Sequence, residues 1–330
     1  MMSFSESIAQ IKKVFAFFAI LIFLSLGFVF IYFGFLSKTK IDNDYLVKEG
    51  SGISGIATDL ENNGIIESAF KFKIYSKIRS LLFSCNIVQL GEYRLLKDEN
   101  YNSLLNKFCN GKTTSKTLTI PEGLETREVI ELLNNSNYLT GEKIISYDEG
   151  IILPETYSFK SGINRNILFA KMRQDLAIFI KNEWKKREKN DLIRSPEDAI
   201  ILASIIEKEA KTDEERPIIA SVYINRLKFN MRLYADPTSI YEITKGRYKL
   251  SRPLTRKDTK IVGNYNTYRK RGLPITPICN PGKKSILAVL HPAKTNYLYF
   301  VVNTDLNGHI FTDNYKDHLK NIKRVKLNRK

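Results

Sequence analysis

The first strong pattern along the chain is an uncharged, mostly apolar run at residues 14–36. Lys12 and Lys13 precede the run, and Lys38 and Lys40 follow it. At about 1.5 Å per helical residue, the run is long enough to cross a ~30 Å hydrocarbon core. It is also longer than the apolar region of a usual signal peptide, and no small-residue cleavage site closes it. The pattern predicts an uncleaved transmembrane helix, with a cleaved signal peptide as the alternative.

The flanks of this span predict how the chain is oriented. A short tail with lysines tends to stay in the cytoplasm, whereas long domains are translocated largely regardless of their charge. We therefore expect residues 1–13 to form a cytoplasmic tail. The rest of the chain is expected outside the cytoplasm, on the periplasmic or extracytoplasmic side, held at the cytoplasmic (inner) membrane by a single pass.

Beyond the span, helix-like and strand-like patterns alternate, which predicts an α+β fold. The roughly 290 residues there suffice for two domains with cores of their own. The first stretch reads as strand, helix, helix and strand, at residues 45–48, 53–62, 68–82 and 88–96. Further helices are expected at 102–109, 127–134 after a Thr126 cap, 167–189, 196–209 and 217–227, with extended segments at 114–120 and 153–159 and a loop-rich stretch at 250–279.

The helix expected after Ser195 has the clearest start signal in the chain. Ser195 is a typical N-cap, Pro196 suits the first helical position, and Asp198 completes a capping box. The apolar run at residues 199–206 follows and leads into two glutamates. An apolar helix that ends in acids raises the question of where each carboxyl points.

The two glutamates should face in different directions. At about 100° per residue, Glu209 projects between Leu202 and Ile205 on the apolar face, whereas Glu207 turns toward Ser204 on the polar side. Burial among aliphatic side chains raises the pKa of a carboxyl, as a general acid near neutral pH requires. Glu209 is therefore the candidate acid and Glu207 its supporting residue. The alternative is a helix end at which Glu209 simply emerges into water.

The formal net charge of +17 raises the question of a nucleic-acid partner. The basic residues are spread along the chain, and no nucleic-acid motif accompanies them. A membrane span favours anionic headgroups or an acidic polymer instead. We expect no nucleic-acid partner, and we interpret the basic cluster at residues 181–189 as a solvated helix face.

Cysteine and histidine usage argues against a metal site or a disulfide framework. Cys85, Cys109 and Cys279 are too few and too scattered for either, although a Cys85–Cys109 bridge can form in an oxidising compartment. The three histidines lack metal-site spacing, and no glycine-rich phosphate loop occurs. We expect no metal and no cofactor.

Six motifs occur in the order found in endolytic murein transglycosylases of the MltG (YceG-like) family. They are ASIIEKE at 203–209, ASVYINRL at 220–227, DPT at 236–238, YNTY at 265–268, GLP at 272–274 and HPAKTNYLYFV at 291–301. The chain resembles this family over essentially its whole length. The resemblance implies a small LysM-like domain at residues 41–118 and a mixed α+β catalytic domain at 119–330.

The resemblance also implies an activity and a catalytic residue. Such enzymes cleave nascent peptidoglycan between N-acetylmuramic acid and N-acetylglucosamine and leave a 1,6-anhydromuramoyl end. Their catalytic glutamate is the second of the Glu-Lys-Glu run, here Glu209. One acid can suffice where the substrate's own 6-hydroxyl attacks C1, whereas ordinary glycosidases use two carboxyls. Peptidoglycan strands and the membrane are the expected partners, and cell-wall synthases are considered as further ones.

Several polar residues are candidates for binding the glycan. Asn225 and the run Tyr265, Asn266, Thr267 and Tyr268 can supply fixed dipoles and a sugar-stacking surface. The alternative for the run is a turn whose Asn and Thr bond their own backbone. We interpret Asp236 as a helix cap rather than a second carboxylate. Arg226 is expected to pair with Glu209 or a nearby acid, or else to face solvent.

Two positions depart from the usual family pattern, and one rival function remains. Ile275 and Thr276 stand where a Pro-Gly pair is typical, and Tyr234 stands where a glutamine is common. Neither change removes an acid. The rival is a non-catalytic, membrane-tethered protein that binds the cell wall or serves as a scaffold, which retention of the Glu209 helix argues against.

Overall fold

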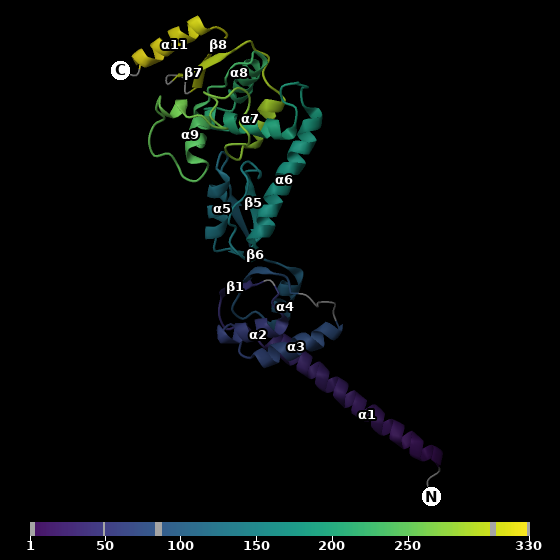
Figure 1. Cartoon of the computed structure of the whole chain (residues 1–330). Coiled ribbons are helices and arrows are strands. Elements are labelled where there is room, and N and C mark those ends of the chain that lie inside the picture. Colours follow the sequence, from purple (N-terminus) through teal and green to yellow (C-terminus); the bar gives the residue numbers. More distant parts are fainter. Residues whose placement is uncertain (1–3, 49, 83–87, 304–307, 329–330) are drawn as a thin grey trace. The chain divides into compact units, whose positions relative to one another are not determined.

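The computed structural model describes residues 4–48, 50–82, 88–303 and 308–328 (Figure 1). Its internal contacts divide the chain into two compact units. Unit 1 comprises Met1–Lys116, Tyr138–Thr140 and Ser158–Ile163, and unit 2 comprises Thr117–Asn137, Gly141–Tyr157 and Asn164–Lys330. The mixture of helices and short strands in both units confirms the α+β class.

An apolar helix opens unit 1. Helix α1 spans Phe4–Ile31 and continues as a π-helical turn, η1, at Tyr32–Leu36. Among the described residues, Lys12–Leu36 is the one helical segment long and apolar enough to cross a membrane. A signal sequence near an N-terminus meets the same criteria of length and composition.

The body of unit 1 is built in the order strand, helix, helix, strand, as predicted. It consists of β1 (Asn43–Val47), α2 (Ile53–Asn62), α3 (Ala69–Leu82) and β2 (Gly91–Leu95), followed by α4 (Tyr101–Asn110). The two strands pair antiparallel, with Asn43 opposite Leu95 and Val47 opposite Gly91. Their inward side chains and those of the three helices form one apolar core, which includes Leu60, Phe72 and Phe108.

The end of the apolar helix belongs to this core. Phe30 and Phe33 pack against it, and the Phe30 and Tyr75 ring centroids lie 5.1 Å apart. Gly34 is buried, and a side-chain carbon there would lie 2.2 Å from a Tyr75 ring carbon, so only glycine fits. Backbone bonds continue the attachment, since the Tyr101 amide donates to the Ser37 carbonyl. A cut at residue 41 therefore removes part of the packing of unit 1.

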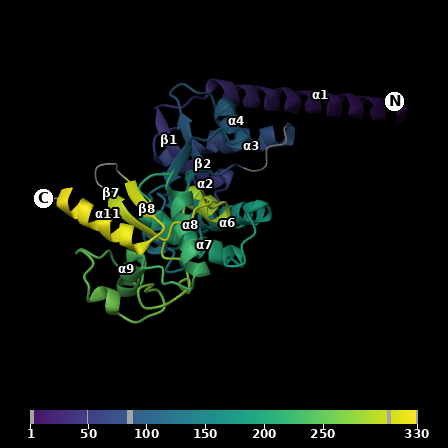
Figure 2. The ribbon, with the colours of Figure 1, turned by 90° about the horizontal axis from the view of Figure 1, so that it is seen from above.

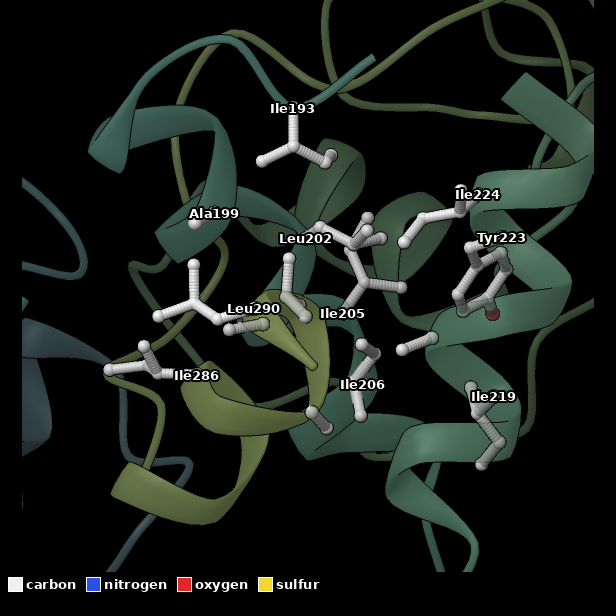
Figure 3. Packing of buried hydrophobic residues seen from close by; sticks show 14 of the residues in the cluster. Ile193, Ala199, Leu202, Ile205, Ile206, Ile219, Tyr223, Ile224, Ile286 and Leu290 are labelled. Carbon is white, nitrogen blue, oxygen red and sulfur yellow. The ribbon is translucent and has the colours of Figure 1, made fainter. Parts of the chain in front are cut away.

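Unit 2 is built around a buried helix, α7 (Pro196–Glu209). It packs against α6 (Arg165–Lys186), α8 (Arg216–Lys228) and α10 (Lys283–Leu290). Figure 3 shows Leu202, Ile205 and Ile206 of α7 among side chains of α8 and α10. Ser204 is also fully buried, so the predicted polar side of this helix is wrong: α7 is enclosed on nearly every side.

Shorter elements complete the architecture. Strands β7 (Tyr299–Asn303) and β8 (Gly308–Thr312) pair antiparallel, and α11 (Tyr315–Asn328) packs against them. The remaining elements are β3 (Ser115–Thr119), α5 (Thr126–Asn135), β4 (Leu139–Thr140), β5 (Thr156–Lys160), β6 (Ile163–Asn164), α9 (Asp236–Thr244) and the 3₁₀ turn η2 (Asp258–Lys260).

Some sequence predictions need correction in detail. Thr126 is not a cap: Glu125 caps α5, and its carboxyl forms a reciprocal capping box with Glu128. The long helix predicted at 167–189 is α6, which begins and ends a few residues earlier. The stretch 250–279 is loop-rich as predicted, with only η2 in it. Cys85 lies outside the described residues, so its pairing with Cys109 stays a prediction.

Candidate active site

The candidate acid, Glu209, is the last residue of α7. The Ser195 hydroxyl accepts a hydrogen bond of 3.1 Å from the Asp198 amide and so caps the start of this helix, as predicted. Ala210 then adopts an extended backbone and ends it. A carboxyl in the last turn of a helix lies at the negative end of the helix dipole, which disfavours its charged form.

The surroundings of Glu209 raise the pKa of its carboxyl to about 7. Burial is the largest cause, and the negative charge of Asp236 is the second. Tyr223, Arg226 and Lys211 act in the opposite direction without cancelling these effects. The residue is partly exposed as a whole, but its carboxyl is almost enclosed. The structure therefore excludes a carboxyl that simply emerges into water, and Glu209 is mostly protonated below about pH 7.

Two side chains of α8 approach this carboxyl. Tyr223 is fully buried, and its hydroxyl has no partner at standard hydrogen-bond geometry in the described part of the chain. The hydroxyl nevertheless acts on Glu209 through a looser contact, and burial together with the Glu209 charge raises the pKa of Tyr223. Tyr223 thus keeps its proton and presents a donor toward Glu209.

Arg226 is held by backbone carbonyls rather than by an acid. Its Nε donates to the Leu298 carbonyl at 2.7 Å, and its guanidinium also donates to the Leu233 carbonyl. Among the residues that the structure describes, no acidic side chain forms an ion pair with it. The sequence left open that Arg226 pairs with an acid or faces solvent. Neither is the case, because Arg226 is buried and bonded to backbone carbonyls. Its charge reaches Glu209 only at a distance.

Asp236 faces Glu209 from the start of α9. It is the first residue of that helix, and the cap position belongs to Ala235, so the interpretation of Asp236 as a cap is wrong. Its Oδ1 accepts the Tyr268 hydroxyl at 2.6 Å. Burial, then this hydrogen bond, raises the pKa of Tyr268, with Glu209 contributing in the same direction. Asp236 and Tyr268 therefore form a hydrogen-bonded pair, and the charge of Asp236 acts on Glu209.

Glu207, two residues earlier, has a very different environment. Its side chain is only 6% exposed, and an Arg216 nitrogen lies 3.1 Å from one carboxylate oxygen. The other oxygen accepts the Gly282 amide at 3.0 Å and the Ser285 hydroxyl at 2.8 Å. Glu207 therefore does not lie on a polar face: it ties the end of α7 to the starts of α8 and α10.

The comparisons with known proteins agree with this architecture. The profile of the YceG-like family matches residues 45–324. The chain belongs to the YceG-like family. The family expected from the sequence motifs is thereby confirmed.

Two relatives and one solved structure show how far the likeness extends. The endolytic murein transglycosylase of Bacillus subtilis (strain 168) is 30% identical over 318 residues, which cover 86% of this chain and 84% of that protein. The endolytic murein transglycosylase of Streptococcus pneumoniae (strain R6) is 26% identical, covering 84% of this chain and 57% of that protein. A YceG-like protein of Listeria monocytogenes, solved by crystallography, matches with a TM-score of 0.52 and 28% identity, over 84% of this chain and 98% of that one.

Three of the predicted glycan contacts of this YceG-like chain bind its own backbone or side chains. The Asn225 amide donates to the Thr295 and Tyr297 carbonyls at 2.8 and 3.0 Å. Asn266 is fully buried and its side chain is bonded to Ser239 and to backbone groups, including the Ile261 carbonyl. Thr267 is equally buried, accepting the Ala235 amide at 3.0 Å and contacting the Thr238 hydroxyl. Their hydrogen bonds position loops, which agrees with the alternative interpretation of the run as a turn.

The two tyrosines of the run have different positions. Tyr265 packs against the Tyr241 ring, with 4.8 Å between centroids, and its hydroxyl contacts Thr276 at 2.9 Å. Tyr268 bonds Asp236 and lies beside Tyr234, whose backbone adopts the left-handed conformation with φ +50°. Of the four predicted residues, Tyr268 is the one brought to Glu209.

A cavity of about 500 Å³ lies at the end of α7 in the YceG-like chain, on the side of Glu207. Lys208 and Pro237 line it, and each directly neighbours a carboxylate residue of the site, Glu209 or Asp236. Its lining also includes acidic and aromatic side chains, among them Glu122, Glu125 and Tyr248. Burial raises the pKa of Glu125 to about 6, helped by the charges of Glu128 and Glu149.

Sequence reasoning missed Tyr223 and undervalued Asp236. Tyr223 sits in an apolar helix pattern, where a tyrosine is more simply a core residue, and only its unpaired hydroxyl distinguishes it. Asp236 precedes a proline at a helix start, which imitates a cap. Within the described residues, no group of three or more histidine, cysteine, aspartate or glutamate side chains is arranged to hold a metal ion.

Proposed function

We propose that this chain is a membrane-anchored endolytic lytic transglycosylase. It cleaves the bond between N-acetylmuramic acid and N-acetylglucosamine in nascent peptidoglycan strands and leaves 1,6-anhydromuramoyl ends. Membership of the YceG-like family and relatives named endolytic murein transglycosylase support the reaction class. The observation that carries the assignment of the acid is the enclosed Glu209 carboxyl, whose pKa is raised to about 7.

In the proposed reaction Glu209 acts first as an acid and then as a base. Its proton passes to the glycosidic oxygen, which leaves C1 as the 4-hydroxyl of the N-acetylglucosamine unit. The muramoyl 6-oxygen then bonds to C1, and its proton passes to the Glu209 carboxylate. The acid is regenerated and no water is consumed. A carboxyl with a pKa near the working pH suits both proton transfers.

The neighbours of Glu209 support this cycle. Asp236 carries the negative charge that, after burial, most favours the protonated form of Glu209. Tyr268 holds this carboxylate in place through a hydrogen bond of 2.6 Å. Tyr223 offers its unpaired hydroxyl to the carboxylate that remains after proton donation. Glu207 supports the site by fixing the end of α7.

A second candidate reaction follows from the position of Asp236. Glycosidases that hydrolyse their substrate use two carboxyls, one as the acid and one as the nucleophile or the base. Asp236 can take the second role because its charge acts on Glu209. The chain is then a hydrolase that releases reducing muramic acid ends.

The location of the proposed enzyme follows from residues 14–36, which we assign as an uncleaved span. The span places both units on the extracytoplasmic side of the cytoplasmic membrane, where new strands emerge. Tethering raises the effective concentration of a substrate that is made at the same surface. The strand, helix, helix, strand order of unit 1 is that expected for a LysM-like domain, and we assign it to glycan binding near cell-wall synthases.

Product analysis separates these functions. The full-length protein in detergent is incubated with purified glycan strands in labelled water, and the ends are analysed by mass spectrometry. Anhydro ends, one water lighter than hydrolysed ends and free of label, are expected. Labelled reducing ends would promote Asp236 to a catalytic base, and strands left intact would favour a non-catalytic wall-binding or scaffold protein.

A further inference from the structure

Helix α3 of unit 1 has an apolar stripe that no part of the described chain covers. Its inward face, with Phe72 and Tyr75, is fully buried in the unit 1 core. On the outside, Phe70, Leu81 and Leu82 are 69%, 82% and 64% exposed. The partly buried Ile74 and Ile78 lie between them at helical spacing, four and eight residues after Phe70. These five residues are called the outer stripe below.

The outer stripe adjoins the place where the apolar helix enters unit 1. Tyr75 contacts both Phe30 and Gly34, and on the helix surface it lies between the core face and the stripe. Both views show the C-terminal end of α3, which carries Leu81 and Leu82, on the side toward which α1 extends (Figures 1 and 2). The stripe therefore lies beside the last turns of the apolar segment rather than at the far end of the unit.

The length of the apolar segment fixes the depth of this contact. If the span stopped before Phe30, only the sixteen residues 14–29 would remain, about 24 Å of helix at 1.5 Å per residue. That length falls short of a ~30 Å hydrocarbon core, and tilting shortens its reach further. Residues 30–36 must therefore lie in the membrane or at its boundary. Because Phe30 and Gly34 touch Tyr75, α3 lies at that same depth.

The polar residues of α3 suit the same location. On the helix surface Lys73 and Lys77 lie beside the Phe70 edge of the stripe, and Lys71, which lies within the stripe, pairs with Glu67 at 3.3 Å. Lys38 and Lys40 follow the span and add basic charge at the same boundary. A helix with an apolar strip and flanking lysines is typical of segments that lie in the plane of a membrane interface and meet anionic headgroups.

We propose that α3 is a membrane-interface helix whose outer stripe lies at the boundary between headgroups and acyl chains of the bilayer that α1 crosses. The inference rests on the anchor assigned under the proposed function. Two attachments at one interface, α1 across it and α3 along it, hold unit 1 in a single orientation on the membrane. Unit 1 is then a rigid base at the lipid surface instead of a domain on a flexible stalk.

Single-tryptophan probes test this arrangement in the full-length protein. Trp184 is the only tryptophan in the chain, so W184F gives a silent background. F70W and L81W place a probe at each end of the stripe. F23W places one within the span, at a residue that is 77% exposed. S54W is the matched control. Ser54 is exposed and lies in the first turn of α2, whereas the other end of α2 leads to Ile65, whose carbonyl accepts the Lys40 amide beside the span.

The probes are read in vesicles of anionic lipid with brominated acyl chains. We expect F70W and L81W to lose at least about twofold more emission than S54W, and to be shielded from acrylamide, as interfacial residues are. If F23W is quenched while F70W and L81W behave like S54W, the stripe does not touch lipid and the inference is wrong, although the anchor stands. If F23W is not quenched either, the span fails and the inference fails with it.

Discussion

Two carboxyls two residues apart, at the end of the same buried helix, have different electrostatic environments. Glu207 has three donors around its carboxyl, the Arg216 guanidinium, the Gly282 amide and the Ser285 hydroxyl. Glu209 is equally withdrawn from water but faces another carboxylate, Asp236, and a tyrosine with no standard hydrogen bond. The surroundings of Glu209 raise the pKa of its carboxyl to about 7.

The contrast shows that burial alone does not make a general acid. Burial raises the pKa of a carboxyl only as far as its neighbours fail to compensate the charge. At Glu207 the fold supplies three donors, and the carboxyl ties the helices together. At Glu209 the neighbouring groups do not compensate for burial, so the carboxyl keeps a proton that it can transfer. Such uncompensated burial costs stability, which a structural residue would have no reason to bear.

Replacing the acid should have the largest effect. Glu209→Gln keeps the size and hydrogen bonding of the side chain but cannot donate and recover a proton. We expect turnover on purified glycan strands to fall at least about a hundredfold, the low end for loss of a general acid. Circular dichroism and thermal unfolding should show an intact fold.

The matched variant for this test is Glu207→Gln in the same helix turn. If Glu209→Gln retains near-normal turnover while Glu207→Gln abolishes it in folded protein, the roles of the two residues are reversed and the comparison above fails.

Glu207→Gln is itself expected to act on stability. The neutral amide cannot balance the positive charge of Arg216, so this buried guanidinium is left with a weaker partner. We expect the free energy of unfolding of unit 2 to fall by about 1–3 kcal/mol, the usual range for a buried polar group that loses its partner. Urea unfolding followed by Trp184 fluorescence in unit 2 measures the change.

Glu197→Gln, an acid in the first turn of the same helix, is the control and should change stability far less. Equal stability of Glu207→Gln and the unmodified protein would mean that the three hydrogen-bond donors around Glu207 do not tie the helices together.

The comparison also separates what the sequence could predict from what it could not. The Ser195 cap and the helical spacing of Leu202 and Ile205 are local, and they predicted a Glu209 carboxyl that is withdrawn from water, as it is in the structure. The partners of Glu207 are not local: Arg216 starts the next helix and Ser285 lies 78 residues away. Periodicity therefore assigned Glu207 to a polar face that the tertiary packing encloses.

The same limit applies to the glycan contacts. Asn225, Asn266 and Thr267 carry the polar groups that a sugar site uses, but such groups equally satisfy buried backbone. Only the partners chosen in the fold distinguish the two uses, and here the partners are the chain's own carbonyls and hydroxyls. Tyr268 gave no stronger signal than its neighbours in sequence, yet it is the one that reaches Asp236.

The smallest expected effect concerns Asp236, and it tests why the two glutamates differ. A general acid is active only while protonated, so a Glu209 pKa of about 7 predicts that activity falls as pH rises through about 7. Asp236→Asn removes the nearby negative charge, which lowers the pKa of Glu209. The alkaline limb of the pH–rate profile should therefore move to lower pH, by up to about one unit, the usual size for one neighbouring charge. At acidic pH, where Glu209 is protonated in both proteins, the difference in activity between them should narrow.

Asp236→Glu restores a charge and should return the limb toward its original pH, whereas a merely structural role for Asp236 would lower activity equally at every pH. A profile that keeps its shape in Asp236→Asn would show that burial alone sets the pKa of Glu209, and the distinction between the two carboxyls would then rest only on the partners of Glu207.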